Sequence, residues 1–238
     1  MMSNFESKTV LIVGGSSGIG AAAAKAFAAL GADVTIASRS QEKLDAVAAD
    51  IGAHVRTAVI DTTDEASVDT FFSNAGRFDH VVISAAQTPG GPVREMALSD
   101  AYAAMNSKFW GAYRVARAVK ITDSGSLTLV SGFLSVRPNK SSVLQGAINA
   151  ALEALARGLA LELSPVRVNT VSPGLIATPL WAKLNEQARQ NMYEGAAARL
   201  PAKRVGQPED VANAIVYLAS TPFATGSTVL VDGGGAIA

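Results

Sequence analysis

The sequence predicts a single α/β domain built on a doubly wound, mostly parallel sheet of about seven strands, with helices on both faces. Short runs rich in Val, Ile, Leu and Thr alternate with longer Ala-rich segments of helical period. Most of the short runs are continuously apolar, which is typical of buried parallel strands. Because the 238 residues contain no internal repeat and no low-complexity linker, we expect one domain over residues 1–238.

The predicted strands are short, mainly aliphatic runs, and the predicted helices lie between them. The strands are expected at Thr9–Val13, Asp33–Ala37, Val55–Ile60, His80–Ile83, Ser126–Val130, Val166–Val171 and Thr228–Val231. The helices are expected at Ile19–Leu30, Glu42–Ile51, Glu65–Asn74, Asp100–Lys120, Val143–Leu163 and Glu209–Ser220. Residues 175–204, after the sixth strand, form the longest insertion, and such segments often cover the substrate side of an open α/β sheet.

A glycine-rich turn joins the first predicted strand to the first helix. It consists of Gly14-Gly15-Ser16-Ser17-Gly18-Ile19-Gly20. Gly14 allows a tight turn, Gly18 a close approach of the backbone to a pyrophosphate, and Gly20 close packing of helix on strand, while the helix N-terminus offers free N–H donors. The context of strand, spacing and helix therefore predicts a dinucleotide-binding turn, with Ser16, Ser17 and Ile19 among its contacts.

The end of the second strand predicts which nicotinamide cofactor is bound. An acidic residue there bonds the ribose 2′-hydroxyl and repels a 2′-phosphate, but this chain has Ser38-Arg39-Ser40. A guanidinium flanked by two hydroxyls suits a phosphate. We therefore expect NADP(H) to be favoured over NAD(H).

Composition excludes several classes of function. Lys plus Arg and Asp plus Glu both number 20, so nothing indicates a nucleic-acid partner. The absence of cysteine removes thiolate nucleophiles, disulfides and Cys-ligated zinc, and the two histidines, His54 and His80, have no metal-ligand spacing. With neither a signal-like segment nor an apolar run of membrane-spanning length, the chain is expected in the cytoplasm and off the membrane.

Motifs along nearly the whole chain resemble those of the short-chain dehydrogenase/reductase family, which implies a Rossmann-like fold. The glycine-rich turn resembles the family's cofactor turn, with Val13 in place of a threonine. Other matching segments are Asp61-Thr62, Ser84-Ala85-Ala86 in place of Asn-Ala-Gly, Asn106, Pro173-Gly174-Leu175-Ile176-Ala177-Thr178, and Val231-Asp232-Gly233-Gly234. The resemblance implies cofactor contacts at Asp61, Thr62, Ala85, Ala86, Pro173, Gly174, Ile176 and Thr178, and an active-site role for Asn106.

The sequence departs from the family at its catalytic Ser, Tyr and Lys. Ungapped alignment back from residues 158–165 puts Gln145 at the tyrosine position and Asn149 at the lysine position. Gly132 falls at the serine position, so Ser131 or Ser135 is left to supply a hydroxyl. Amides polarise a carbonyl by hydrogen bonding but do not transfer a proton. We expect these residues, with Asn106 and with Trp181 of the insertion, to line an atypical site.

Two main functional hypotheses remain open from the sequence. The first is an NADPH-dependent reductase of carbonyls or activated alkenes with an atypical active site. The second is a non-catalytic NADPH-binding sensor or partner subunit, and an isomerase or lyase on the same fold is a third. Trp110, Tyr113 and the Ala-rich face of residues 147–160 favour self-association, and the family resemblance implies a tetramer, with a dimer as the alternative.

Overall fold

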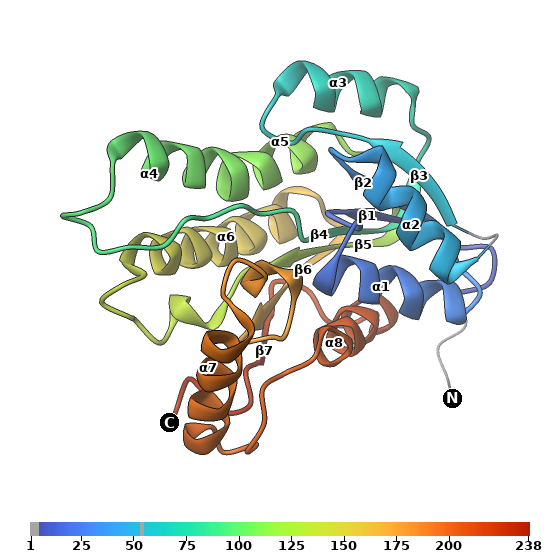
Figure 1. Ribbon diagram of the computed structural model, residues 1–238. Helices are drawn as coiled ribbons and strands as arrows, with labels where there is room; N and C mark the ends of the chain where they lie inside the picture. Colours follow the sequence, from blue (N-terminus) through green and yellow to red (C-terminus); the bar gives the residue numbers. More distant parts are fainter. Residues whose placement is uncertain (1–4, 53–54) are drawn as a thin grey trace.

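A computed structural model describes residues 5–52 and 55–238, and its core is one parallel sheet (Figure 1). The seven strands follow the order β3-β2-β1-β4-β5-β6-β7, and every pair is parallel. This confirms the predicted doubly wound α/β fold. The strands are β1 Thr9–Val13, β2 Asp33–Ser38, β3 Val55–Val59, β4 Phe78–Ile83, β5 Ile121–Val130, β6 Arg167–Pro173 and β7 Thr228–Val231.

Helices cover both faces of the sheet and enclose two cores. Buried side chains of α1, α2 and α8 pack on one face, and those of α3, α5 and α6 pack on the other. The α-helices are α1 Gly18–Ala29, α2 Gln41–Ile51, α3 Glu65–Asn74, α4 Leu98–Met105, α5 Gly111–Ala118, α6 Val143–Glu162, α7 Glu186–Arg199 and α8 Pro208–Ser220. Two short 3₁₀ turns, η2 Phe133–Ser135 and η3 Pro179–Trp181, complete the described elements.

Several strand bounds differ from the prediction by a few residues, β5 most of all, and two helical regions differ in kind. The helix predicted over residues 100–120 starts at Leu98 and contains a π-helical segment, η1 Asn106–Trp110, between α4 and α5. A π segment changes the direction of the side chains that follow it. The insertion at 175–204 contains α7, which has no apolar stripe to predict it and whose N-cap Asn185 accepts from Ala188 N at 2.8 Å.

The strand order reverses between β1 and β4, and this is where the glycine-rich turn lies. β1 pairs with β2 on one side and β4 on the other, so the helices that follow β1 and β4 leave on opposite faces. Ser84 N and Ala85 N both donate to Val13 O, at 2.8 and 3.1 Å. In open α/β sheets the crevice at such a switch point is the usual ligand site.

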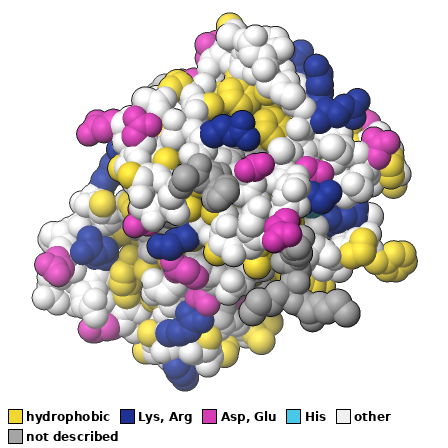
Figure 2. Space-filling model, turned by 90° about the vertical axis from the view of Figure 1, so that its right-hand side faces the viewer, with side chains coloured by type: hydrophobic (Ala, Val, Ile, Leu, Met, Phe, Trp, Pro, Cys, Tyr) yellow, Lys and Arg dark blue, Asp and Glu magenta, His cyan; other side chains and the backbone are white. Residues whose placement is uncertain are grey.

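The surface carries no large field of one sign on the face shown in Figure 2, where Lys and Arg side chains lie among Asp and Glu. Among the described residues, no helix is long and apolar enough to cross a membrane. The same part of the chain holds no group of three His, Asp or Glu side chains arranged to ligate a metal. His80 is buried against Ser126, and His54 lies outside the described residues.

Candidate active site

The glycine-rich turn is packed so closely against the backbone that two of its glycines leave no room for a side chain. Gly14 has a φ of +91°, and a Cβ built on it would lie 2.5 Å from Ala85 N. A Cβ on Gly20 would overlap Gly14 O. Ser17, the N-cap of α1, makes no side-chain capping bond, so the first N–H groups of that helix are available to an anion.

The end of β2 presents Ser38, Arg39 and Ser40 beside Asp61. Ser40 Oγ caps α2 by accepting from Lys43 N at 3.4 Å, whereas Ser38 Oγ is buried and has no hydrogen-bond partner among the described residues. Arg39 is exposed. Burial raises the pKa of Asp61, but hydrogen bonds from Thr63 and the charge of Arg39 outweigh it and hold that pKa below its usual value.

The segment after β6 folds back toward the glycine-rich turn. Gly174 N donates to Val231 O at 3.0 Å, and Ile176 O accepts from Trp181 Nε1 at 2.9 Å. Thr178 Cγ2 lies 3.3 Å from a Cβ built on Gly18. The structure thus brings the segment that begins at Pro173 against the turn that was predicted to hold the cofactor.

A buried carboxylate organises the polar groups at the ends of β5 and β6. Glu153 Oε1 accepts from Ser131 Oγ at 2.9 Å, Ser135 Oγ at 2.7 Å and Ser172 Oγ at 3.3 Å. Ser131 follows β5, Ser172 lies in β6, and Glu153 lies in α6. Both candidate serine hydroxyls are therefore engaged with the same carboxylate.

Lys108, in the π segment η1, also contacts this cluster. Its Nζ donates to Ser131 O and to Asn149 Oδ1, both at 2.7 Å. Burial lowers the pKa of Lys108 to about 8, against the opposing effect of the Glu153 charge. Gly132 leaves room for the Asn149 amide, because a Cβ on Gly132 would lie 2.7 Å from Asn149 Nδ2.

The remaining two predicted site residues point to different partners. Gln145 Nε2 donates to Thr88 O at 2.9 Å, which ties the loop after β4 to α6. Asn106 Oδ1 accepts from Arg114 Nη2 at 2.8 Å, and its Nδ2 donates to Thr63 O at 3.4 Å. The structure therefore brings Gln145, Asn149 and Glu153 onto one face of α6 at four-residue spacing, while Asn106 is directed toward α5 and the loop before α3.

Two members of the cluster, Lys108 and Glu153, were not identified from the sequence. Glu153 continues the four-residue spacing of Gln145 and Asn149, so the helical period was a usable signal. Lys108 directly precedes Phe109-Trp110 in a segment that the sequence predicts as a regular α-helix. Its direction depends on the π segment, which the residue pattern did not reveal.

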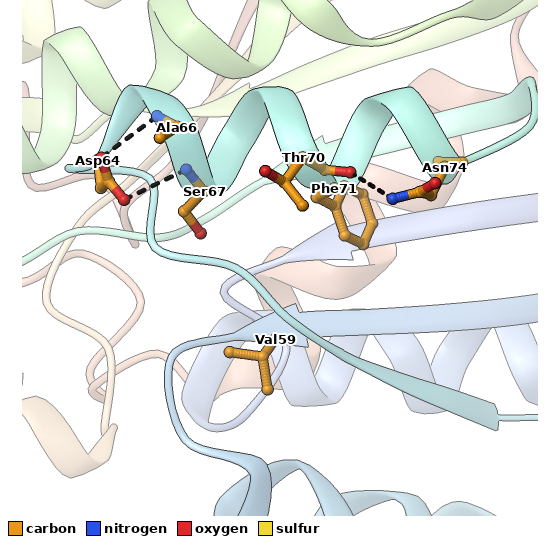
Figure 3. Close-up of a pocket in the computed structure, with 8 residues that line it drawn as sticks. Val59, Asp64, Ala66, Ser67, Thr70, Phe71 and Asn74 are labelled. Carbon is orange, nitrogen blue, oxygen red and sulfur yellow. Dashed lines mark hydrogen bonds between the residues drawn. The ribbon is translucent and has the colours of Figure 1, made fainter.

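A separate open pocket lies between α3 and the edge strand β3 (Figure 3). Phe71 lines it, while Asp64 caps α3 at its end by accepting from Ala66 N and Ser67 N, each at 3.2 Å. The lining includes no residue of the Glu153 cluster. Its place at the edge of the sheet separates it from the polar groups at the ends of β5 and β6.

Comparison with known proteins identifies the family. The family model described as Enoyl-(Acyl carrier protein) reductase matches residues 13–235. The chain is 33% identical over 244 residues to a 3-oxoacyl-(acyl-carrier-protein) reductase of Thermotoga maritima, covering 96% of this chain and 98% of that protein. The chain belongs to the short-chain dehydrogenase/reductase family. It is also 34% identical over 265 residues to sorbose reductase of Schizosaccharomyces pombe, covering 98% and 97% of the two chains.

Solved structures of short-chain dehydrogenases share the whole fold. A short-chain dehydrogenase/reductase of Brucella melitensis has a TM-score of 0.91 at 29% identity, with 98% of both chains covered. A small-chain dehydrogenase solved in complex with NADPH has a TM-score of 0.84 at 33% identity, covering 98% of this chain and 100% of that chain. The relatives named as reductases make this chain an oxidoreductase of the short-chain dehydrogenase/reductase type.

The residues present fit the nicotinamide dinucleotide that short-chain dehydrogenases bind. The turn at Gly14 and Gly20, where an added Cβ would collide with Ala85 N and Gly14 O, leads into α1, which begins without a side-chain cap. Ser38 Oγ is a buried hydroxyl that finds no hydrogen-bond partner within residues 5–52 and 55–238. These three features suit a ligand that brings phosphate and hydroxyl oxygens close to the backbone.

Proposed function

We propose that the protein is an NADP(H)-dependent oxidoreductase that reduces a carbonyl or an activated alkene in an active site without the family's Tyr-x-x-x-Lys pair. The tight glycine-rich turn that leads into the uncapped N-terminus of α1 is the observation that carries the cofactor part of this proposal. No tyrosine occurs between Tyr113 and Tyr193, so Gln145 and Asn149 take the two positions on α6.

The proposed cofactor contacts lie in the glycine-rich turn, at the N-terminus of α1 and at the ends of the neighbouring strands. The α1 N-terminus, with Ser16, Ser17, Gly18 and Ile19, would hold the pyrophosphate. Bound in this way, the reduced nicotinamide supplies a hydride. We assign the remaining contacts to the ends of the other strands: Ser38, Arg39, Ser40, Asp61, Thr62, Ala85, Ala86, Pro173, Gly174, Ile176 and Thr178.

The polar cluster would orient the substrate. The amide of Asn149, whose Oδ1 is held by Lys108, provides a fixed N–H dipole beside the segment after Pro173, while the Ser131 and Ser135 hydroxyls, which donate to Glu153, hold the surrounding walls in place. Gln145 holds the loop after β4 in place. Preorganised dipoles stabilise charge that develops on a carbonyl oxygen. Trp181, partly buried behind that segment, would line the substrate side, whereas Asn106 contributes through its bonds to the helix and loop around it.

Preference for NADPH over NADH rests on Arg39 and the two serines beside it. Charge-assisted hydrogen bonds contribute about 1.5–3 kcal/mol, so Arg39→Ala should weaken NADPH binding by roughly 10- to 150-fold. NADH binding should change little, because NADH has no 2′-phosphate. Arg56→Ala, at an exposed arginine of the neighbouring strand β3, is the matched control. Equal losses for both nucleotides in calorimetric titrations would remove the phosphate-recognition argument.

The first experiment is titration of the purified protein with NADPH and NADH, followed by NADPH oxidation with activated ketones, diketones, quinones and enones. Tight NADPH binding with turnover supports the reductase. Tight binding without turnover on any member of the panel contradicts it in favour of a sensor or partner subunit. Failure to bind either nucleotide contradicts both.

We also infer a homo-oligomer that buries the aromatic surface of η1 and α5. Trp110 and Tyr113 are 44% and 43% exposed, and their rings pack edge to face with centroids 5.6 Å apart. A preformed pair of exposed aromatic rings suits an interface with a second copy. Light scattering after gel filtration tests this, and a monomer at micromolar concentration would contradict it. A cytoplasmic location stays a prediction.

A further inference from the structure

We propose that Lys108 is the proton donor of this site, delivering a proton from Nζ to the carbonyl oxygen of the substrate. The inference rests on the proposed reductase function and names the group that completes it. Lys108 belongs to η1, and its Nζ lies between α6 and the end of β5.

The ammonium of Lys108 is fixed in direction and keeps one N–H in reserve. An ammonium has three N–H donors. Two of them are used by Ser131 O and Asn149 Oδ1, and no further acceptor for Nζ is found among the described residues. One acceptor lies just after β5 and the other in α6, so together they hold Nζ between these two elements.

The polar cluster continues from Lys108 to the segment that is proposed to hold the nicotinamide. Ser131, whose carbonyl oxygen accepts from Lys108, donates its hydroxyl to Glu153 at 2.9 Å. Glu153 in turn accepts from Ser172, the residue before Pro173. The proton-carrying group and the nicotinamide segment are therefore joined by one continuous hydrogen-bonded network.

Other groups of this network are poor proton donors near neutral pH. Asn149 is an amide, and Ser131 and Ser135 are hydroxyls already donating to Glu153. Glu153 is the charged group that faces Lys108 from α6, while the acceptors from β5 and α6 that touch Nζ are neutral. Efficient general acids have a pKa near the working pH, and burial brings that of Lys108 down to about 8.

The chemical step balances with this assignment. The carbonyl carbon receives a hydride, with its two electrons, from the bound reduced nicotinamide, which is left oxidised. The π bond of the carbonyl breaks, and its oxygen takes a proton from Lys108 Nζ. The lysine is left as a neutral amine, and water returns the proton. The product is an alcohol.

The test compares wild type, Lys108→Met and Lys108→Arg, with Lys120→Met as the control at an exposed lysine just after α5. Two probes are used: an aliphatic diketone, whose reduction needs a proton on an alkoxide, and a quinone, whose hydroquinone anion takes its proton from water. Lys108→Met should lose about 10²- to 10⁴-fold in diketone turnover and much less with the quinone.

Lys108→Arg keeps the positive charge but does not release a proton, since a guanidinium stays protonated throughout the working pH range. It should therefore bind NADPH like the wild type yet reduce the diketone as slowly as Lys108→Met. The wild-type diketone rate should fall as the pH rises through about 8, and this fall should be absent from both variants.

A readout without turnover accompanies these rates. In the cofactor-free protein, the pH dependence of acylation at Lys108, followed by peptide mass spectrometry, should show a midpoint near pH 8, and added NADPH should slow the acylation. Equal loss of both probe reactions together with weaker NADPH binding would overturn the proposal in favour of a cofactor-holding lysine. An acylation midpoint of Lys108 well above pH 8, or full diketone activity in Lys108→Arg, would also overturn it. A wild type that reduces neither probe contradicts the reductase function itself, and the proton role with it.

Discussion

Glu153 should be the residue on which the geometry of the polar cluster most depends. Its side chain is buried, and Oε1 accepts from three serine hydroxyls, which lie just after β5, in the turn η2 and in β6. Replacing it with alanine leaves these hydroxyls without their acceptor and opens a cavity beside them. We therefore expect Glu153→Ala to be among the most destabilising single substitutions in α6.

The magnitude follows from the three hydrogen bonds. A hydrogen bond to a charged group contributes about 1.5–3 kcal/mol, but hydroxyls rotate to new acceptors, and Ser131 Oγ already has Val171 O at 3.4 Å. After this compensation the expected loss is about 2–5 kcal/mol for Glu153→Ala. Glu153→Gln keeps one acceptor oxygen and the shape, so about 1–2 kcal/mol is expected.

Urea unfolding followed by circular dichroism measures these losses. Glu162→Ala, at an exposed glutamate near the end of the same helix, is the control and should stay within about 0.5 kcal/mol of the wild type. If Glu153→Ala is no less stable than Glu162→Ala, the carboxylate does not organise the cluster and the reasoning is refuted. Because the Glu153 charge raises the pKa of Lys108, Glu153→Gln should also lower the Lys108 acylation midpoint.

Three further substitutions test the glycine-rich turn, the N-cap of α3 and the buried histidine. Gly14→Ala should cost more than about 2 kcal/mol and weaken nucleotide binding, since the φ of Gly14 is positive and the new Cβ would lie 2.5 Å from Ala85 N. Gly52→Ala, with φ +116° and open space around its Cβ, measures the cost of the positive φ alone, and equal losses for the two variants would contradict the role of the close approach. Asp64→Ala, by thermal unfolding, should cost about 1 kcal/mol through loss of the α3 cap, and no loss would contradict that capping role. Burial lowers the pKa of His80 from 6.5 to about 4, so the unfolded chain takes up protons first as the pH falls. The stability that neutral His80 contributes is complete above pH 6.5 and is lost as the pH falls toward about 4, with about 2 kcal/mol lost by pH ~5. Urea unfolding of wild type and His80→Phe at pH 6.5 and pH ~5 should show a smaller change in stability for the variant.

Much of the fold could be predicted because its signals are local. β1 and β7 have their predicted bounds, and α3 begins and ends at the predicted residues Glu65 and Asn74. The first half of β5, which begins at Ile121, was not predicted because its residues are largely polar. Backbone pairing with β4, rather than apolar content, extends the strand there. α7 was missed for a related reason: its surface is largely polar, so no apolar period marks it.

The sequence alone determined the family, the glycine-rich turn and the charge at the end of β2, since each depends on residue types at fixed spacing within one segment. It did not determine which charged side chain meets Asn149. That depended on the π segment at residues 106–110, which directs Lys108 across to α6, and on Gly132, whose missing side chain leaves space for the amide. Contacts between segments 41 residues apart arise from packing, and only the tertiary structure decides them.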